Sequence, residues 1–264
     1  MIRVVIVEDS PTMRAILTAR LERDGDIVVI GAAANAAEGR AMIRERDPDV
    51  VTLDIEMPGM NGLDFLEKIM MLRPTPVIVV SGFAQQGAEA TARALAIGAV
   101  ACYAKSENTG GLPFDDSGRL SAMVRDAARA RFDERAPASS PGQPPLSLNQ
   151  PRLIAIGAST GGVEALQILL GEFPANCPPT LIVQHITTRF ASAIARILDR
   201  HCAPTVVLAE PDMSLQRGHI YLATGDDRHL TVGAGPRLSC RLYPGALVSG
   251  HVPSVDVLFL WSRG

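Results

Sequence analysis

Residues 153–162 read LIAIGASTGG, an apolar run that breaks at glycine, exposes Ser159 and continues into a helical pattern over 163–170. A serine at such a strand-to-helix turn has its hydroxyl at the end of a sheet. The backbone N–H groups that follow lie at a helix N-terminus, where they can hold a developing oxyanion. A second apolar run, 180–185, ends in His185. A serine and a histidine at the ends of neighbouring strands favour acyl-transfer chemistry.

Other interpretations of this segment stay open. The pattern Gly157-x-Ser159-x-Gly161 is typical of a nucleophile elbow, but it is weak alone. Small residues before a helix also cradle dinucleotide phosphates, although an acidic residue is then expected where Gln184-His185 closes the second strand. A third interpretation makes Ser159 an N-cap and His185 a structural histidine. The remaining histidines lack a comparable context and are interpreted as structural: His201, His219, His229 and His251.

The first half of the chain alternates strand-like and helix-like patterns, and its strands are uniformly apolar. Such alternation predicts an α/β fold with a parallel sheet covered on both faces. The predicted strands are 3–7, 27–33, 50–54, 76–81 and 100–103, and the predicted helices are 11–24, 36–46, 62–72, 86–98 and 120–132.

Residues 133–150 are rich in Pro, Ser, Ala and Gln and have no periodicity, which favours a linker over an ordered cap. A second α/β alternation follows, with later short strands predicted at 218–223, 229–232 and 237–243. The sequence therefore predicts two domains, 1–132 and 151–264.

Carboxylates close two strands of the first predicted domain. Glu8 and Asp9 follow the first strand, and Asp54 ends the third. In doubly wound sheets, ligands bind beyond the carboxyl ends of the strands. Three carboxylates gathered there repel one another unless a cation joins them, and such hard oxygen ligands suit Mg²⁺. We therefore expect a magnesium site at which Asp54 can attack a phosphoryl group.

A hydroxyl and an amine complete this pattern. Ser81 ends the fourth strand and can bond a phosphoryl oxygen, and Lys105 follows the fifth strand and can pair with the same oxygens. The proline- and glycine-containing turn DIEMPGMNG leaves Asp54 accessible. Scattered, solvated acids are the alternative interpretation, which the placement at successive strand ends disfavours.

The segments VIVEDS, VVTLDIEMPGMNG and VIVVSG, together with Lys105, resemble a response-regulator receiver domain over residues 1–132. The resemblance implies a flavodoxin-like fold and phosphorylation of Asp54 by a histidine kinase. It also implies Mg²⁺ at Asp9, Asp54 and the carbonyl of Glu56, with Glu8 in the same acidic cluster. Two positions depart from that family's pattern. Its usual proline after the lysine is Ser106 here, and its usual aromatic three residues earlier is Cys102, with Tyr103 beside it.

The segments LIAIGASTGGVEAL, LIVQHI, GHIYLATGDDRHL and HVPSVDVLF resemble the catalytic domain of chemotaxis methylesterases, the CheB family. That family also carries a receiver domain on the N-terminal side, so the resemblance covers nearly the whole chain. It implies a second, Rossmann-like doubly wound sheet that hydrolyses glutamate methyl esters on chemoreceptors and deamidates receptor glutamines without a cofactor. By that match Ser159 is the nucleophile, His185 is the general base, and Thr160 and Gly161 line the oxyanion and substrate site.

The third catalytic member of that family is an aspartate in a Gly-Met-Gly-x-Asp-Gly segment downstream of PSVDVLF, and this sequence lacks that segment. We therefore expect a catalytic domain that is incomplete at its C-terminus and impaired in activity. The spacing of Asp226, Asp227 and Asp256 does not recommend them as substitutes. The alternative function is non-enzymatic, with the receiver acting as a phosphoryl sink or a kinase-docking module. A nucleotide-dependent oxidoreductase is a distant third.

Composition limits the partners and the compartment. The formal net charge of −3 supplies no basic field for nucleic acid. No apolar run approaches the roughly 20 residues that cross a bilayer, and the N-terminus lacks a signal-peptide pattern. The four cysteines have neither paired nor metal-binding spacing and are interpreted as buried or idle thiols. We expect a cytoplasmic protein without membrane insertion. The family resemblance implies that its partners are chemoreceptors and the chemotaxis histidine kinase.

Overall fold

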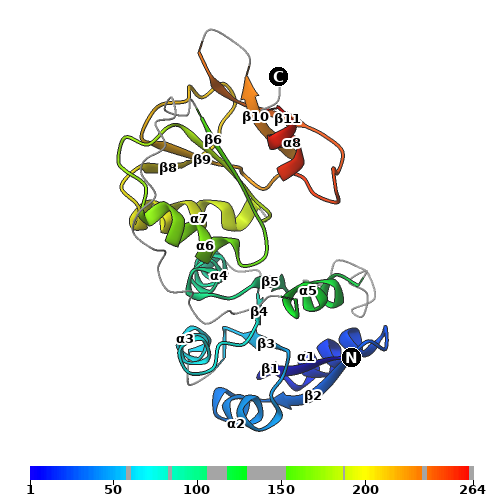
Figure 1. Cartoon of the computed structure of the whole chain (residues 1–264). Coiled ribbons are helices and arrows are strands. Elements are labelled where there is room, and N and C mark those ends of the chain that lie inside the picture. Colours follow the sequence, from blue (N-terminus) through cyan, green and yellow to red (C-terminus); the bar gives the residue numbers. More distant parts are fainter. Residues whose placement is uncertain are drawn as a thin grey trace. The chain divides into compact units, whose positions relative to one another are not determined.

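The structure, a computed structural model, describes residues 1–57, 61–82, 85–105, 118–129, 153–186, 188–233 and 237–261. The chain divides into two compact units, Met1–Ala136 and Pro137–Gly264 (Figure 1). The predicted linker at 133–150 and residue Ser106 lie outside the described residues. No helix in the described parts of the chain has both the length and the apolar character that a membrane span requires.

The N-terminal unit is a five-stranded parallel sheet in the order β2-β1-β3-β4-β5 (Figure 1). This is the flavodoxin-like order, and it confirms the predicted fold class. The strands are β1 (Ile2–Val7), β2 (Ile27–Ala33), β3 (Val50–Asp54), β4 (Val77–Ser81) and β5 (Ala101–Ala104). The helices are α1 (Pro11–Glu22), α2 (Ala36–Arg46), α3 (Gly62–Leu72), α4 (Gln85–Ile97) and α5 (Arg119–Ala127).

Local features of this unit hold the carboxyl ends of β1 and β3 in place. Ser10 caps α1 by accepting a hydrogen bond from the backbone N–H of Met13 (3.3 Å), which starts the helix directly after β1. Helix α3 passes very close to the end of β3, because a Cβ atom on Gly62 would lie 2.5 Å from Cα of Ile55. Only glycine permits this approach, so Asp54 ends its strand against a fixed helix start.

The C-terminal unit contains a four-stranded parallel sheet in the order β6-β7-β9-β8 and a separate antiparallel hairpin, β10–β11. The strands are β6 (Ile154–Ala158), β7 (Thr180–Gln184), β8 (Thr205–Leu208), β9 (His219–Leu222), β10 (Arg228–Gly233) and β11 (Ser239–Pro244). The helices are α6 (Gly162–Gly171), α7 (Thr188–His201) and α8 (Val255–Trp261). The parallel sheet confirms the predicted α/β class, whereas the hairpin was not distinguished from it in the sequence.

The core of the C-terminal unit joins this parallel sheet to the hairpin and to α8. Leu181 of β7 and Tyr221 of β9 are buried together with Leu230 of β10 and Leu258 of α8. Because side chains alternate along a strand, Ile182 is buried on the opposite face of the sheet. Figure 1 shows α6 and α7 together on one side of the sheet, away from α8. Within the described residues none of the four cysteines forms a disulfide, and Cys177 and Cys240 are buried.

Candidate functional sites

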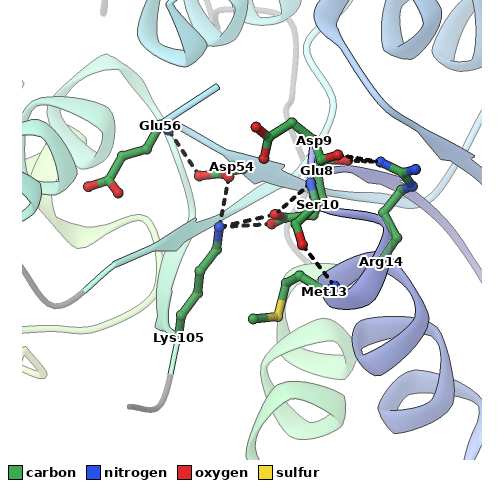
Figure 2. Close-up of polar contacts among 8 residues, drawn as sticks. All are labelled: Glu8, Asp9, Ser10, Met13, Arg14, Asp54, Glu56 and Lys105. Carbon is green, nitrogen blue, oxygen red and sulfur yellow. Dashed lines mark hydrogen bonds and ion pairs between the residues drawn. The ribbon is translucent and has the colours of Figure 1, made fainter. Parts of the chain in front are cut away.

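The first candidate site lies at the carboxyl ends of β1 and β3 (Figure 2). Glu8 and Asp9 follow β1, Asp54 ends β3, and one oxygen from each of the three carboxylates lies within 4.8 Å of the others. Glu8 and Asp54 are each only 1% exposed, and Asp9 is half-buried. Buried carboxylates are costly unless a cation or hydrogen bonds compensate them. The geometry therefore favours a cation at this end of the sheet.

Lys105 supplies one such cation. Its Nζ lies 2.7 Å from Oδ2 of Asp54 and 3.0 Å from Oε2 of Glu8. Burial is the largest influence on the pKa of Lys105 and lowers it, but hydrogen bonds and charges from Asp54 and Glu8 outweigh burial and raise the pKa. Burial, and next the charge of Asp54, raise the pKa of Glu8, although Lys105 acts in the opposite direction. Lys105 thus stays charged between two acids that repel each other.

Backbone contacts fix the orientation of the cluster. The N–H of Glu56 donates to Oδ1 of Asp54 (2.9 Å), and Arg14 donates to the carbonyl oxygens of Glu8 (2.6 Å) and Asp9 (2.9 Å). Figure 2 shows the side chain of Glu56 pointing away from the other acids. The structure therefore brings Glu8, Asp9 and Asp54 together, while the side chain of Glu56 does not join them. Arg14 belongs to none of the sequence motifs, and its role was not predicted.

Ser81 is fully buried at the end of β4. Its carbonyl accepts a hydrogen bond from the backbone N–H of Lys105 (2.8 Å), so two of the predicted site residues are joined through the backbone. Its hydroxyl lies 3.6 Å from the Sγ of Cys102, the position at which an aromatic residue was expected. The neighbouring Tyr103 is buried in the core, where its hydroxyl accepts from Arg20. The thiol, rather than a ring, therefore contacts the Ser81 hydroxyl.

The second candidate site lies at the carboxyl ends of β6 and β7. The parallel register pairs Ala158 with Gln184, so the next residues along the two strands, Ser159 and His185, emerge side by side. Nδ1 of His185 lies 3.2 Å from Oγ of Ser159, and both Ser159 and Thr160 are exposed. A hydroxyl within hydrogen-bonding distance of an imidazole and open to solvent is an arrangement that can perform acyl transfer.

The turn after β6 is held by the backbone and by Gln184. The N-cap of α6 is Gly161, at φ +72°, without a side-chain cap, so the interpretation of Ser159 as an N-cap is wrong. The carbonyl of Ser159 accepts from the N–H of Gly162 (2.8 Å) and from Nε2 of Gln184 (2.8 Å). A Cβ on Gly162 would lie 2.2 Å from Oε1 of Gln184. These contacts therefore hold the backbone of Ser159 in place, while its hydroxyl contacts the imidazole of His185.

His251 joins this site, although its sequence context suggested only a structural role. Its ring stacks on that of His185, with centroids 3.7 Å apart and an interplanar angle of 12°. The backbone holds His251 in place through two 3.1 Å hydrogen bonds with Val248. Burial, and then the charge of His251, lower the pKa of His185, while Asp256 acts in the opposite direction. The signal in the sequence was that His251 begins HVPSVDVLF, a segment already singled out for its resemblance.

Nε2 of His185 is buried and has no hydrogen-bond partner among the residues that the structure describes. When Nδ1 accepts the Ser159 hydroxyl, Nε2 carries the ring proton, and an orienting carboxylate acts at such an atom in serine hydrolases. Asp256 instead accepts from Ser249 (2.5 Å), and Asp226 is paired with Arg228 (2.5 Å). These two acids do not supply that contact.

Comparison with known proteins assigns each unit to a family. A response regulator receiver domain model matches residues 4–113, and a CheB methylesterase model matches residues 154–261. The chain is 51% identical over 260 residues to the protein-glutamate methylesterase/protein-glutamine glutaminase of Rhizobium etli. It is 48% identical over 264 residues to the protein of the same description from Agrobacterium fabrum.

Each of these alignments covers 97% of the chain and 74% of the relative, so the sequence spans about three-quarters of their length. Among solved structures, the CheB methylesterase catalytic domain of Thermotoga maritima is 29% identical, with a TM-score of 0.41. That match covers 42% of this chain and 60% of the other.

Proposed function

Because this chain belongs to the family of protein-glutamate methylesterase/protein-glutamine glutaminases that carry a receiver domain, we propose that it removes methyl esters from glutamate side chains of chemoreceptors, and amide groups from their glutamines, in chemotaxis. The observation that carries this proposal is the 3.2 Å contact between Oγ of Ser159 and Nδ1 of His185 at an exposed sheet edge. The receiver controls this hydrolysis through its phosphorylation.

The proposed reaction uses the chain's own residues at each step. Oγ of Ser159 attacks the ester carbonyl while its proton passes to Nδ1 of His185, and the N–H groups of Thr160 and Gly161 stabilise the oxyanion. Collapse of the tetrahedral intermediate breaks the bond to the leaving group, which departs as methanol with the proton from His185. Water, deprotonated by His185, then releases the glutamate and restores Ser159. A glutamine substrate releases ammonia by the same steps.

The acid limb of the activity profile is expected below the ordinary histidine pKa of 6.5, because the base is active when neutral and burial with His251 lowers the pKa of His185. His251→Phe keeps an aromatic ring on His185 but removes a neighbouring charge, so the midpoint of this limb should move to higher pH. The measurement is kcat/KM for methanol release as a function of pH. His201→Phe, at the exposed end of α7, is the matched control. An unshifted midpoint in His251→Phe would contradict the assignment of His185 as the base.

Gln184→Met is expected to lower kcat by about 10- to 100-fold with little change in KM, because a nucleophile displaced by a fraction of an ångström reacts poorly. The substitution removes the 2.8 Å hydrogen bond to the Ser159 carbonyl but keeps the volume of the buried side chain. Steady-state methanol release separates kcat from KM. Gln167→Met on α6 is the control, and equal losses in the two variants would show that Gln184 does not position the nucleophile.

In the receiver, we propose that Asp54 accepts a phosphoryl group from the chemotaxis histidine kinase. Lys105 lies 2.7 Å from Asp54 and is placed to pair with the phosphoryl oxygens, and Ser81 ends the adjacent strand. Oxygens of Glu8, Asp9 and Asp54 within 4.8 Å fit a Mg²⁺ ion, since this ion prefers carboxylate ligands. When bound, Mg²⁺ neutralises the charge that phosphorylation adds. The carbonyl of Glu56 is proposed as a further ligand.

Mg²⁺ is expected to stabilise the receiver against heat, by about 1.4 kcal/mol at a concentration ten times its Kd. A domain of this size then melts at a temperature about 5 °C higher. The stabilisation should shrink as the pH falls through the raised pKa of Glu8, which lies above its ordinary value of 4.5, because protons compete with the ion. Calorimetry with and without MgCl₂ measures it. The Asp9→Asn variant should lose the rise in melting temperature with MgCl₂. The control Asp64→Asn, at an exposed position of α3, should keep it. Equal shifts in the two variants would place the ion elsewhere.

The experiment that tests the proposed function as a whole is methanol release from methylated receptor with and without acetyl phosphate as phosphodonor. Release that rises with the phosphodonor supports both the hydrolase and its control by the receiver. Release that does not change with the phosphodonor would support the hydrolase activity and would contradict its control by the receiver. No release under either condition, together with normal phosphorylation, would favour the non-enzymatic phosphoryl sink.

A further inference from the structure

The receiver has a groove between α2 and α3, and its lining residues belong to neither candidate site. Its volume is about 210 Å³. Four cationic side chains line it, two from α2 (Arg40 and Arg44), one from α3 (Lys68), and Arg73 just after α3. All four are exposed. Arg73 is ion-paired with Asp47 (2.5 Å), whereas Arg44 lies 3.8 Å from an exposed Glu45, a contact of little strength, so the positive charge of the rim comes mainly from Arg40 and Arg44. The groove therefore presents a local positive rim on a chain whose formal net charge is −3.

The floor of the same groove is apolar. Ile43, Phe65 and Ile69 line it and are each at most 5% exposed, so they form a fixed surface of the core. Leu72 lines the groove as well and is 67% exposed, and the adjacent Met71 is 81% exposed. Large apolar side chains left this open at the end of a helix are typical of a surface that a partner covers.

The groove is held in shape without a ligand. Arg73 donates from Nη1 to the carbonyl of Arg44 (3.1 Å) and from Nη2 to Oδ1 of Asp47 (2.5 Å). These contacts join the end of α3 to the end of α2, so the two walls do not need to be assembled when a partner binds. A preformed site lowers the entropic cost of binding.

We propose that the α2–α3 groove binds a short acidic peptide segment of a partner protein, with one bulky apolar side chain inserted into the groove and flanking carboxylates on the cationic rim. The volume suits a single large side chain, and the rim complements negative charge on either side of it. A membrane surface fits less well, because an anionic bilayer would face the whole negatively charged chain, whereas a peptide meets only the local rim.

The test uses the full chain and a fluorescein-labelled peptide of sequence EEEFEE, with binding followed by fluorescence anisotropy. Binding should weaken roughly tenfold when phenylalanine is replaced by serine (EEESEE), because the apolar anchor is lost. It should also weaken as salt is raised. A peptide of sequence KKKFKK should not bind. Failure of EEEFEE to bind, or equal binding of all three peptides, would overturn the proposal.

Variants localise the site. Arg40→Glu/Arg44→Glu should raise the Kd of EEEFEE roughly tenfold or more, and Leu72→Ser by a few-fold. All three side chains are exposed, so these variants are expected to fold, which circular dichroism checks. Arg93→Glu/Arg119→Glu is the matched control, since it changes the net charge equally at exposed positions of α4 and α5. Equal losses in the two double variants would show non-specific attraction and overturn the proposal.

An experiment with lipid vesicles distinguishes binding of a lipid surface from binding of a peptide. Vesicles with and without phosphatidylserine are sedimented with the parent chain and with Arg40→Glu/Arg44→Glu. Sedimentation that depends on phosphatidylserine and on these arginines, without binding of EEEFEE, would reassign the groove to anionic lipid. The proposal does not depend on hydrolysis at Ser159, so its failure would leave the proposed function intact.

Discussion

Replacement of Ser159 by alanine is expected to lower methanol release from methylated receptor by on the order of 10²-fold, because the attacking atom is removed from a site whose His185 already lacks an orienting carboxylate among the described residues, and losses within a triad are not additive. The fold should be unaffected, since the Ser159 side chain is exposed and the turn is held by backbone contacts at its carbonyl. The measurement is the rate of methanol release by the parent and the variant at equal concentration, with acetyl phosphate present.

Ser192→Ala is the matched control for this prediction, because Ser192 is an exposed serine on α7. It should release methanol at the parental rate. A Ser159→Ala variant that equals the parent would refute the nucleophile assignment and with it the proposed mechanism. If neither the parent nor the variant releases methanol, the second hypothesis, a receiver without esterase activity, gains support.

The Asp54→Asn variant is expected to incorporate no acid-labile phosphoryl group, because the amide oxygen is a far weaker nucleophile than the carboxylate. Asp54 is 1% exposed and lies 2.7 Å from Nζ of Lys105, so the substitution also removes a buried negative charge from the pair. Incorporation is measured by intact-protein mass spectrometry after treatment with acetyl phosphate and Mg²⁺.

Asp64→Asn, at an exposed position in the first turn of α3, is the control and should be phosphorylated like the parent. The methanol-release rate of Asp54→Asn should no longer respond to the phosphodonor. Labelling that persists in Asp54→Asn would move the phosphorylation site to another acid of the cluster, with Asp9 the first to examine.

Much of the fold could be read from the chain because its strands are short, apolar and regularly spaced between helical segments. The run at 50–54 was predicted with the bounds that β3 has, and the run at 180–185 extends one residue beyond β7. The family resemblance and the α/β class are confirmed. The later elements were harder to read, because hairpin strands β10 and β11 have the same short apolar pattern as parallel strands.

For the candidate sites as well, the sequence predicted some of the residues and missed others. The rule that ligands gather at the carboxyl ends of parallel strands predicted that Glu8 and Asp54 would meet, and that Ser159 would lie beside His185. These placements agree with the distances in the structure, while the catalytic and phosphorylation roles of the residues stay predictions. His251 and Gln184 were missed, since neither belongs to a motif that names a chemical role.

The sequence by itself determined the two α/β sheets and the strand ends at which reactive side chains emerge, because strand direction and side-chain alternation follow from local patterns. Only the tertiary structure decided that His251 stacks on His185, that Gln184 anchors the Ser159 carbonyl, and that α2 and α3 enclose a cationic groove. The physical reason is that these contacts depend on the positions of side chains far apart in the chain, and periodicity carries no information about such distances.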